Sequence, residues 1–137
     1  MLNTLQYRIH QHQRLANLRL RLLRLHKLLL ETERIAYEQR QGKVSRGELL
    51  QLVINHDQFA WLHRLSELIV QIDELLQADE PVTSETMDML FSDISILLTP
   101  SELGDDFASK YDAALQHSPD VVLAHADVMA LLASSGF

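Results

Sequence analysis

The chain has 137 residues, which suits one domain, and its amino-acid content excludes several classes of protein. It contains no cysteine, so disulfides, thiolate zinc sites and cysteine nucleophiles are excluded. Its net charge is −7, and no stretch approaches the roughly 18 uncharged apolar residues of a membrane span. We therefore expect a single cytoplasmic domain over residues 1–137 that does not enter a membrane.

Leu and Ala dominate the apolar residues, while Gly and Pro are few and fall between periodic segments, which favours helices over strands. The sequence thus predicts an all-α helical bundle with a long N-terminal helix. About six helices are expected, over residues 2–41, 46–55, 57–77, 84–98, 100–117 and 119–133.

Local signals mark the ends of these helices. Gly42 suits the left-handed residue that often follows a helix, and Ser45 with Glu48 has the spacing of a capping box. The third helix is expected to stop before Pro81, and Thr83 or Ser84 can cap the fourth.

Two further helices are predicted from Thr and Ser residues that precede prolines. Thr99-Pro100 and Ser118-Pro119 each combine a capping residue with a proline suited to the first helical turn. The helices they open are expected to bury Leu103, Phe107 and Val122 among other apolar residues.

Apolar side chains recur at helical spacing along every predicted helix. An inner row on the first helix follows a heptad pattern, and the third helix carries a matching row, so these two helices should form the core pair. The inner row is Leu15, Leu18, Leu22, Leu25 and Leu29, and the matching row is Leu62, Leu65, Ile69, Ile72 and Leu76.

The first helix has a second apolar row about 140° from the inner row at about 100° per residue. This outer row comprises Leu2, Leu5, Ile9, Ala16, Leu20, Leu23 and Leu30. Either the domain covers both rows, or the outer row forms a homodimer interface. A helix of about 40 residues spans about 60 Å, whereas a compact domain of this size has a radius of gyration of about 14 Å, so part of the helix should overhang or bend.

Charge is divided unevenly along the chain. Residues 1–46 contain ten Lys/Arg and three Asp/Glu, and residues 47–137 contain two and sixteen, which gives net charges of +7 and −14. Arg14, Arg21 and Arg24 share one face and are candidate interface residues that could also contact phosphates. The acidic total and the missing base-reading elements argue against nucleic acid as the main partner.

Histidines raise the question of a metal. His63 and Glu67 lie one helical turn apart and are the best local candidate ligands, but the paired Glu-x-x-His segments of bundle metal sites are missing. A solvated ion pair is the simpler interpretation of these two residues. His125 is expected at the edge of the core with one hydrogen bond, and Asp73 is expected to reach an arginine of the first helix.

No motif for nucleophilic catalysis, phosphate binding or a cofactor is present, so the sequence predicts no cofactor and a protein that is not an enzyme. The segments Phe59-Ala60-Trp61-Leu62-His63, Ser66-Glu67-Leu68-Ile69-Val70 and Gln71-Ile72-Asp73-Glu74-Leu75-Leu76, preceded by Gly47-Glu48-Leu49-Leu50, resemble those of small all-helical bacterial proteins of no assigned activity. The resemblance implies a bacterial cytoplasmic protein and implies no catalytic residue.

These observations lead to three functional expectations. The first is a protein–protein interaction or oligomerisation module, most simply a homodimer, with a further protein partner left open. The second is a binding protein for a small apolar or metal ligand in the bundle core. The third is a dimer that binds nucleic acid weakly.

Overall fold

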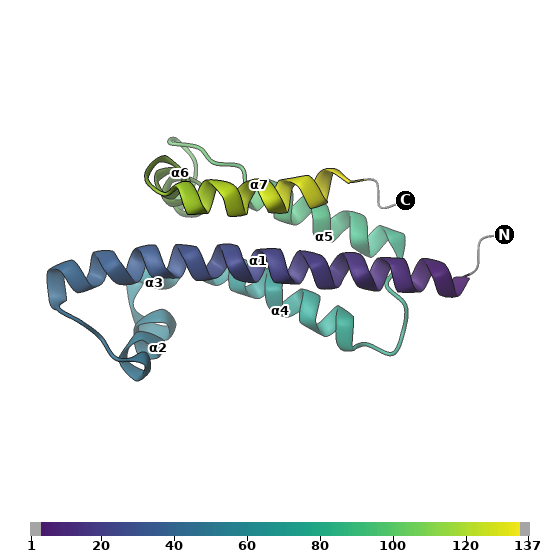
Figure 1. The fold of residues 1–137 in the computed structure, drawn as a ribbon, viewed down its shortest axis with the longest axis horizontal. Helices are drawn as coiled ribbons and strands as arrows, with labels where there is room; N and C mark the ends of the chain where they lie inside the picture. Colours follow the sequence, from purple (N-terminus) through teal and green to yellow (C-terminus); the bar gives the residue numbers. More distant parts are fainter. Residues whose placement is uncertain (1–3, 135–137) are drawn as a thin grey trace.

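The computed structural model describes residues 4–134, which form helices without any strand, so the predicted all-α bundle is confirmed (Figure 1). Leu2 of the outer row lies outside the described residues. The helices are α1 (Thr4–Gln41), α2 (Arg46–Asn55), α3 (Asp57–Ala60), α4 (His63–Gln77), α5 (Ser84–Leu97), α6 (Asp106–His117) and α7 (Pro119–Ala133).

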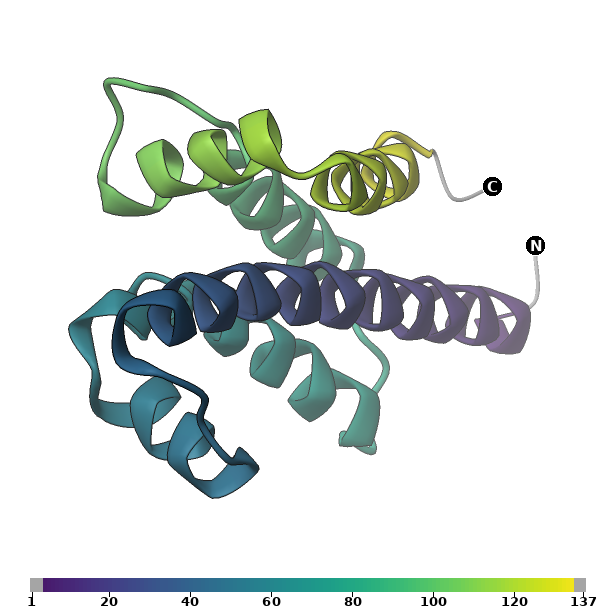
Figure 2. The ribbon, with the colours of Figure 1, turned by 60° about the vertical axis from the view of Figure 1, so that its left-hand side comes forward.

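Helix α1 runs through the middle of the molecule and organises the other helices around it. It packs against α7 on one side and α4 on the other (Figure 1). Both ends of α1 extend past these neighbours, and α2 stands away from the bundle below α1 (Figure 2). The predicted overhang of the first helix is therefore present in the fold.

Helix ends follow the local signals at most places. Gly42 has a φ of 88°, the left-handed conformation that a residue without Cβ adopts at low cost. Ser45 and Glu48 form both hydrogen bonds of the capping box, at 3.2 and 3.3 Å. Ser118 caps α7 through the N–H of Val121, with Pro119 at the start of the helix.

The prediction of one continuous helix over residues 57–77 is wrong. The chain turns at Trp61 and Leu62, which separate α3 from α4. In a straight helix, Phe59 and Trp61 would lie about 200° apart and could not both face the core. The turn, closed by a bond from Leu62 N–H to the carbonyl of Phe59, lets all three side chains be buried.

The predicted start of the helix at residue 100 is also wrong. Helix α6 begins at Asp106, and the Asp105 carboxylate accepts a hydrogen bond from Ala108 N–H at 2.9 Å. A helix from Pro100 would place Gly104 in its interior, at a cost of about 1 kcal/mol relative to alanine, whereas Asp105 offers a strong cap after it. Leu103, expected in the core, is consequently 98% exposed.

The core matches the predicted rows closely. Every residue of the inner row is buried, as are Leu62, Leu65, Ile69 and Ile72 of the matching row. Helices α5, α6 and α7 complete the core with the buried side chains of Met87, Leu90, Ile94, Leu97, Phe107, Tyr111, Val121, Ala124 and Val128. Val122, expected to face inward, is exposed.

Candidate interaction surface

The outer row of α1 remains partly uncovered by the bundle. Leu5, Ile9 and Leu20 are 58%, 49% and 61% exposed, whereas Ala16 and Leu23 are half-buried. Leu30 is also half-buried, and like Leu23 it packs against the edge of the core. Burial within the chain therefore accounts for the C-terminal part of the row but leaves its N-terminal part facing outward.

The three candidate arginines lie on another side of α1 and contact the same chain. Arg14 stacks on the ring of Phe91, with its guanidinium carbon 4.5 Å from the ring centre. Arg21 donates to the backbone carbonyl of Asp127 at 2.6 Å, and Arg24 lies 3.7 Å from the Asp127 carboxylate. All three arginines, which could have contacted the phosphates of a nucleic acid, therefore contact residues of this chain.

Polar contacts fix the orientation of α4 along α1. Three pairs join the helix to the segment 61–73 in antiparallel order: Arg19 with Asp73, His26 with Ser66, and Glu33 with Trp61. The ion pair of Asp73 with an arginine of the first helix is the contact expected from the sequence, and it is confirmed. The three pairs show which turn of α1 lies beside which turn of α4.

His26 and Ser66 resemble a base beside a hydroxyl nucleophile. The His26 Nε2 lies 2.9 Å from Ser66 Oγ, and burial, with a smaller effect of His63, lowers the pKa of His26 and favours the neutral imidazole. Acyl transfer also needs N–H donors aimed at an oxyanion. Because Ser66 sits within α4, where backbone N–H groups bond along the helix, we interpret the pair as a structural contact between α1 and α4.

His63, one of the two candidate metal ligands, makes a hydrogen bond to α2. Its Nε2 lies 2.7 Å from the carbonyl oxygen of Val53, which can only accept, so the imidazole N–H donates. Glu67 lies one turn further along α4 and is exposed. Within residues 4–134, no three His, Asp or Glu side chains are grouped so that they could hold a metal ion.

Helix α2 is an apolar surface element that sequence reasoning did not single out. None of its residues is buried, although Leu50 and Ile54 are 57% and 55% exposed and its other apolar residues are only half-covered. Isolated helices of this length are marginal in water, and packing normally stabilises them. The signal in the sequence was a cluster of apolar residues interrupted only by Gln51, at Leu49–Leu50 and residues 52–54.

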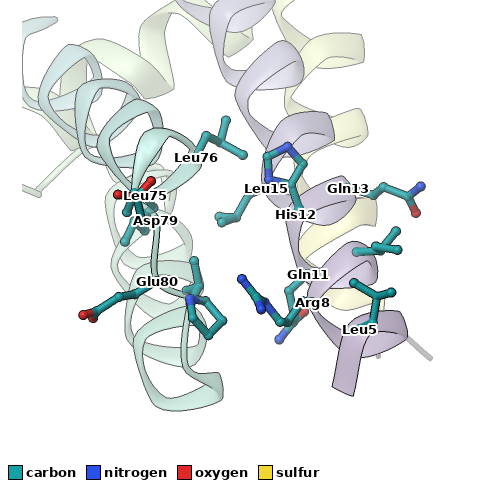
Figure 3. A pocket seen from close by; sticks show the side chains of 14 residues that line it. Leu5, Arg8, Gln11, His12, Gln13, Leu15, Leu75, Leu76, Asp79 and Glu80 are labelled. Carbon is teal, nitrogen blue, oxygen red and sulfur yellow. The ribbon is translucent and has the colours of Figure 1, made fainter. Parts of the chain in front are cut away.

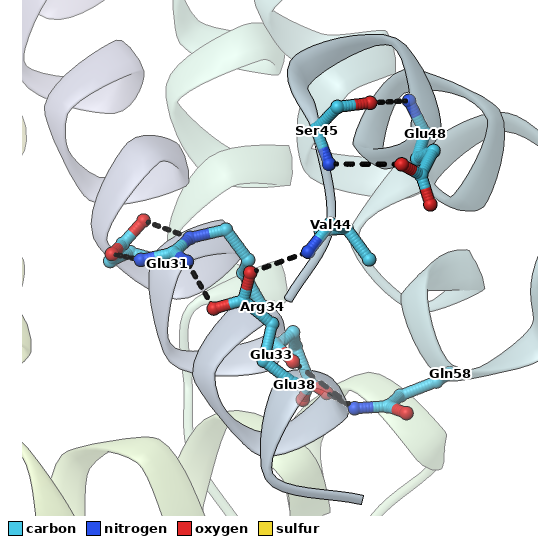
Figure 4. A network of polar contacts seen from close by, with 8 residues as sticks. All are labelled: Glu31, Glu33, Arg34, Glu38, Val44, Ser45, Glu48 and Gln58. Atoms are coloured by element: carbon cyan, nitrogen blue, oxygen red, sulfur yellow. Dashed lines mark hydrogen bonds and ion pairs between the residues drawn. The ribbon is translucent and has the colours of Figure 1, made fainter. Parts of the chain in front are cut away.

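Charged side chains at the C-terminal end of α1 hold the segment that leads into α2 (Figure 4). Arg34 pairs with Glu31 and Glu38, and the Glu38 carboxylate also accepts from Val44 N–H at 2.9 Å. The hydrogen bond from Arg34 lowers the pKa of Glu31. Gln58 donates to the Glu33 carboxylate at 2.8 Å, so α3 is fastened to the same end of α1.

A cleft of about 430 Å³ lies between the N-terminal end of α1 and the segment that joins α4 to α5. Leu15 and Leu76 point toward each other across it, and Arg8 reaches into it while Glu80 points away (Figure 3). Arg8 forms no ion pair within the described part of the chain. The cleft thus combines apolar walls with an available positive charge.

His125 makes a hydrogen bond at the edge of the core, as expected, and its partner is Tyr111. The phenol oxygen lies 2.6 Å from His125 Nδ1. Burial raises the pKa of Tyr111 and lowers that of His125, so the neutral phenol donates to the neutral imidazole. This pair joins α6 to α7 inside the bundle and is not part of the outer row of α1.

No protein-family model, curated protein or solved structure matches this chain. No helix within residues 4–134 has the length and apolar character required to cross a membrane. The surface chemistry of the chain itself, above all the outer row of α1, is therefore the basis for inferring its function.

Proposed function

We propose that this protein is a non-enzymatic interaction module that forms a homodimer through the outer row of α1. The observation that carries the proposal is the exposure of Leu20, at 61%, in line with exposed Leu5 and Ile9 on the same helix. Scattered apolar residues are normal on a surface, but a row along one long helix marks an association site.

The spacing of the outer row suits pairing with a second helix. Ile9, Ala16, Leu23 and Leu30 recur at every seventh position, which is the repeat that allows two helices to pack side by side; Ile9 is exposed and the other three are half-buried. A second copy offers an identical row, so the contact is self-complementary and closes as a dimer. At about 25 cal/mol per Å² of apolar surface, an interface of standard size provides enough gross hydrophobic energy to offset the entropy lost on association.

Light scattering after size-exclusion chromatography tests this proposal. The wild-type chain is expected to elute with twice the chain mass at micromolar concentration, and Leu20→Glu is expected to give a folded monomer. Leu103→Glu is the matched control, because Leu103 is 98% exposed on the loop before α6 and lies off α1. A wild-type monomer, or equal effects of the two variants, contradicts the proposal.

One finer feature of the proposal, the location of the protein, rests on the sequence. The cytoplasmic location follows from the absence of a long uncharged apolar stretch and from the resemblance to bacterial helical proteins. A partner other than a second copy would use the same outer row, and it would then compete with dimer formation. Adding such a partner to the dimer should lower the dimer fraction.

The cleft favours a second candidate function, the binding of a small apolar ligand with a negatively charged end. Leu15 and Leu76 provide apolar walls, and Arg8 provides the charge that a carboxylate would pair with. Laurate is a suitable probe for calorimetry. Binding that weakens at least tenfold in Arg8→Gln but persists in Lys43→Gln would support this function, and no binding of laurate would remove it.

A further inference from the structure

We infer that the two copies pack with their α1 helices parallel, so that the acidic outer face of α4 in each copy lies against Lys27 of the other. The inference rests on the homodimer proposed above and adds its orientation. It follows from where charge lies beside the outer row.

Charged side chains of both signs lie next to the outer row without a close ion pair, and three of them bear on the orientation. Glu67 and Glu74 are exposed and lie seven residues apart, on the same face of α4. Lys27 is exposed on α1, at nearly the same angle around the helix as Ile9 and Leu20. None of the three lies within ion-pair distance of an opposite charge in residues 4–134, in contrast to Arg19 and Arg34, although Lys27 lies one turn from Glu31 and helps to lower the pKa of that carboxyl.

The contacts between the antiparallel helices α1 and α4 show which turn of α1 lies level with each of these charged residues. Since His26 lies beside Ser66, Glu67 is next to the turn of α1 that contains His26 and Lys27. Since Arg19 lies beside Asp73, Glu74 is next to the turn that contains Arg19. The acidic face of α4 therefore runs at the level of residues 19–27 of α1, alongside Leu20 and Leu23 of the outer row, on one side only.

Symmetry then decides which charges meet in a dimer. If the α1 helices pair antiparallel, the two-fold axis is perpendicular to them, and both copies of α4 lie on the same side of the contact. Glu67 and Glu74 then meet the same side of the other copy, where Asp79 and Glu80 of the α4–α5 segment outnumber Arg8, and like charges oppose association.

If the α1 helices pair parallel, the two-fold axis runs along them, and each α4 lies beside the opposite flank of the other α1. Glu67 of one copy then lies at the same height as Lys27 of the other, and two identical ion pairs form. The parallel arrangement pairs Glu67 with Lys27, whereas the antiparallel one brings the acidic faces of α4 to the same side, so electrostatics favours the parallel dimer.

The position of α2 agrees with the parallel arrangement. His63 holds Val53 against the outer side of α4, so α2 projects on the side where the other copy would lie. In the parallel dimer, α2 lies beside the flank of the other α1 that faces away from its own α4. That flank carries Ile35, which is 46% exposed, and Leu50 and Ile54 of α2 gain an apolar neighbour there.

Disulfide trapping tests the orientation directly, because the chain has no native cysteine. Leu5→Cys and Leu23→Cys are made separately, and each is oxidised alone and in a mixture with the other. In a parallel dimer, each variant links to itself. In an antiparallel dimer, at most one can do so, since the two positions lie about 27 Å apart along the helix and a disulfide needs Cα atoms within about 7 Å. Leu103→Cys is the control for random collisions.

A charge exchange tests the ion pair itself. Lys27→Glu is expected to raise the dimer dissociation constant about tenfold, and Glu67→Lys in the same chain is expected to restore it. A dimer that links only between Leu5→Cys and Leu23→Cys chains, or a double variant no tighter than Lys27→Glu, overturns the parallel arrangement and leaves the dimer standing. A wild-type monomer by light scattering overturns the dimer and the arrangement together.

Discussion

The imidazole of His63 donates a hydrogen bond from Nε2 to the carbonyl oxygen of Val53, 2.7 Å away, and this bond ties α2 to α4. Since α2 buries no side chain fully, this bond supplements the contacts of its half-buried residues. His63→Ala is expected to release α2 at a cost of about 1 kcal/mol, and amide hydrogen exchange over residues 46–55 should become severalfold faster.

His117→Ala is the control for this experiment, because His117 is exposed at the end of α6. It should leave exchange in α2 unchanged. Equal exchange rates in the wild type and His63→Ala would show that the His63 bond does not hold α2.

The two apolar rows of α1 should differ sharply in their effect on folding. Leu18 of the inner row is fully buried, and Leu20 of the outer row is 61% exposed. Leu18→Ala is expected to reduce the free energy of unfolding by about 2–5 kcal/mol, because it leaves a cavity. Leu20→Ala in the monomer should cost less than about 1 kcal/mol. Urea unfolding at low protein concentration measures both, and similar losses would mean that the outer row is buried within the chain.

Stability should fall as the pH drops below the ordinary histidine range. The pKa values of His26 and His125 are both lowered from 6.5 in the folded protein, so the unfolded chain binds more protons below about pH 6.5. The free energy of unfolding should therefore decrease from about pH 7 downward, until the lowered pKa values are reached. Changing both residues to Gln should flatten this decrease.

Urea unfolding at pH values between about 7.5 and 5.5 provides the measurement for the histidines. Glu31 contributes no loss of stability in this window, because the hydrogen bond from Arg34 lowers the pKa of its carboxyl below the ordinary value. A steep decrease that persists in the double Gln variant would assign the pH dependence to other groups.

The start of α6 can be tested by removing each of its two candidate caps. Asp105→Ala is expected to lower the free energy of unfolding by about 1 kcal/mol, because Ala108 N–H loses its acceptor. Thr99→Ala should change it far less, since the Thr99 hydroxyl bonds to the carbonyl of Ser95 and caps no helix. Thermal unfolding of both variants measures the difference, and a larger loss in Thr99→Ala would restore the start at residue 100.

The outer row of α1 could be identified from the sequence, but the arginines predicted to share its interface lie on another side of α1. Ile9 and Leu20 could be placed on one face because helical periodicity fixes angles within a single helix. Arg14 and Arg21 turned out to contact α5 and α7, since their partners Phe91 and Asp127 come from distant parts of the chain. The cleft near Arg8 was missed for the same reason, because two separate segments form its walls.

The sequence by itself determined the helical class, the inner row from Leu15 to Leu29, and the caps at Ser45 and Ser118, because periodicity and capping act over a few neighbouring residues. Only the tertiary structure decided the break at Trp61 and the position of α2. The break depends on which buried side chains fit together across α1, because burial against distant partners outweighs local helix propensity. The position of α2, which buries no side chain, depends instead on contacts with distant residues such as the hydrogen bond between His63 and Val53.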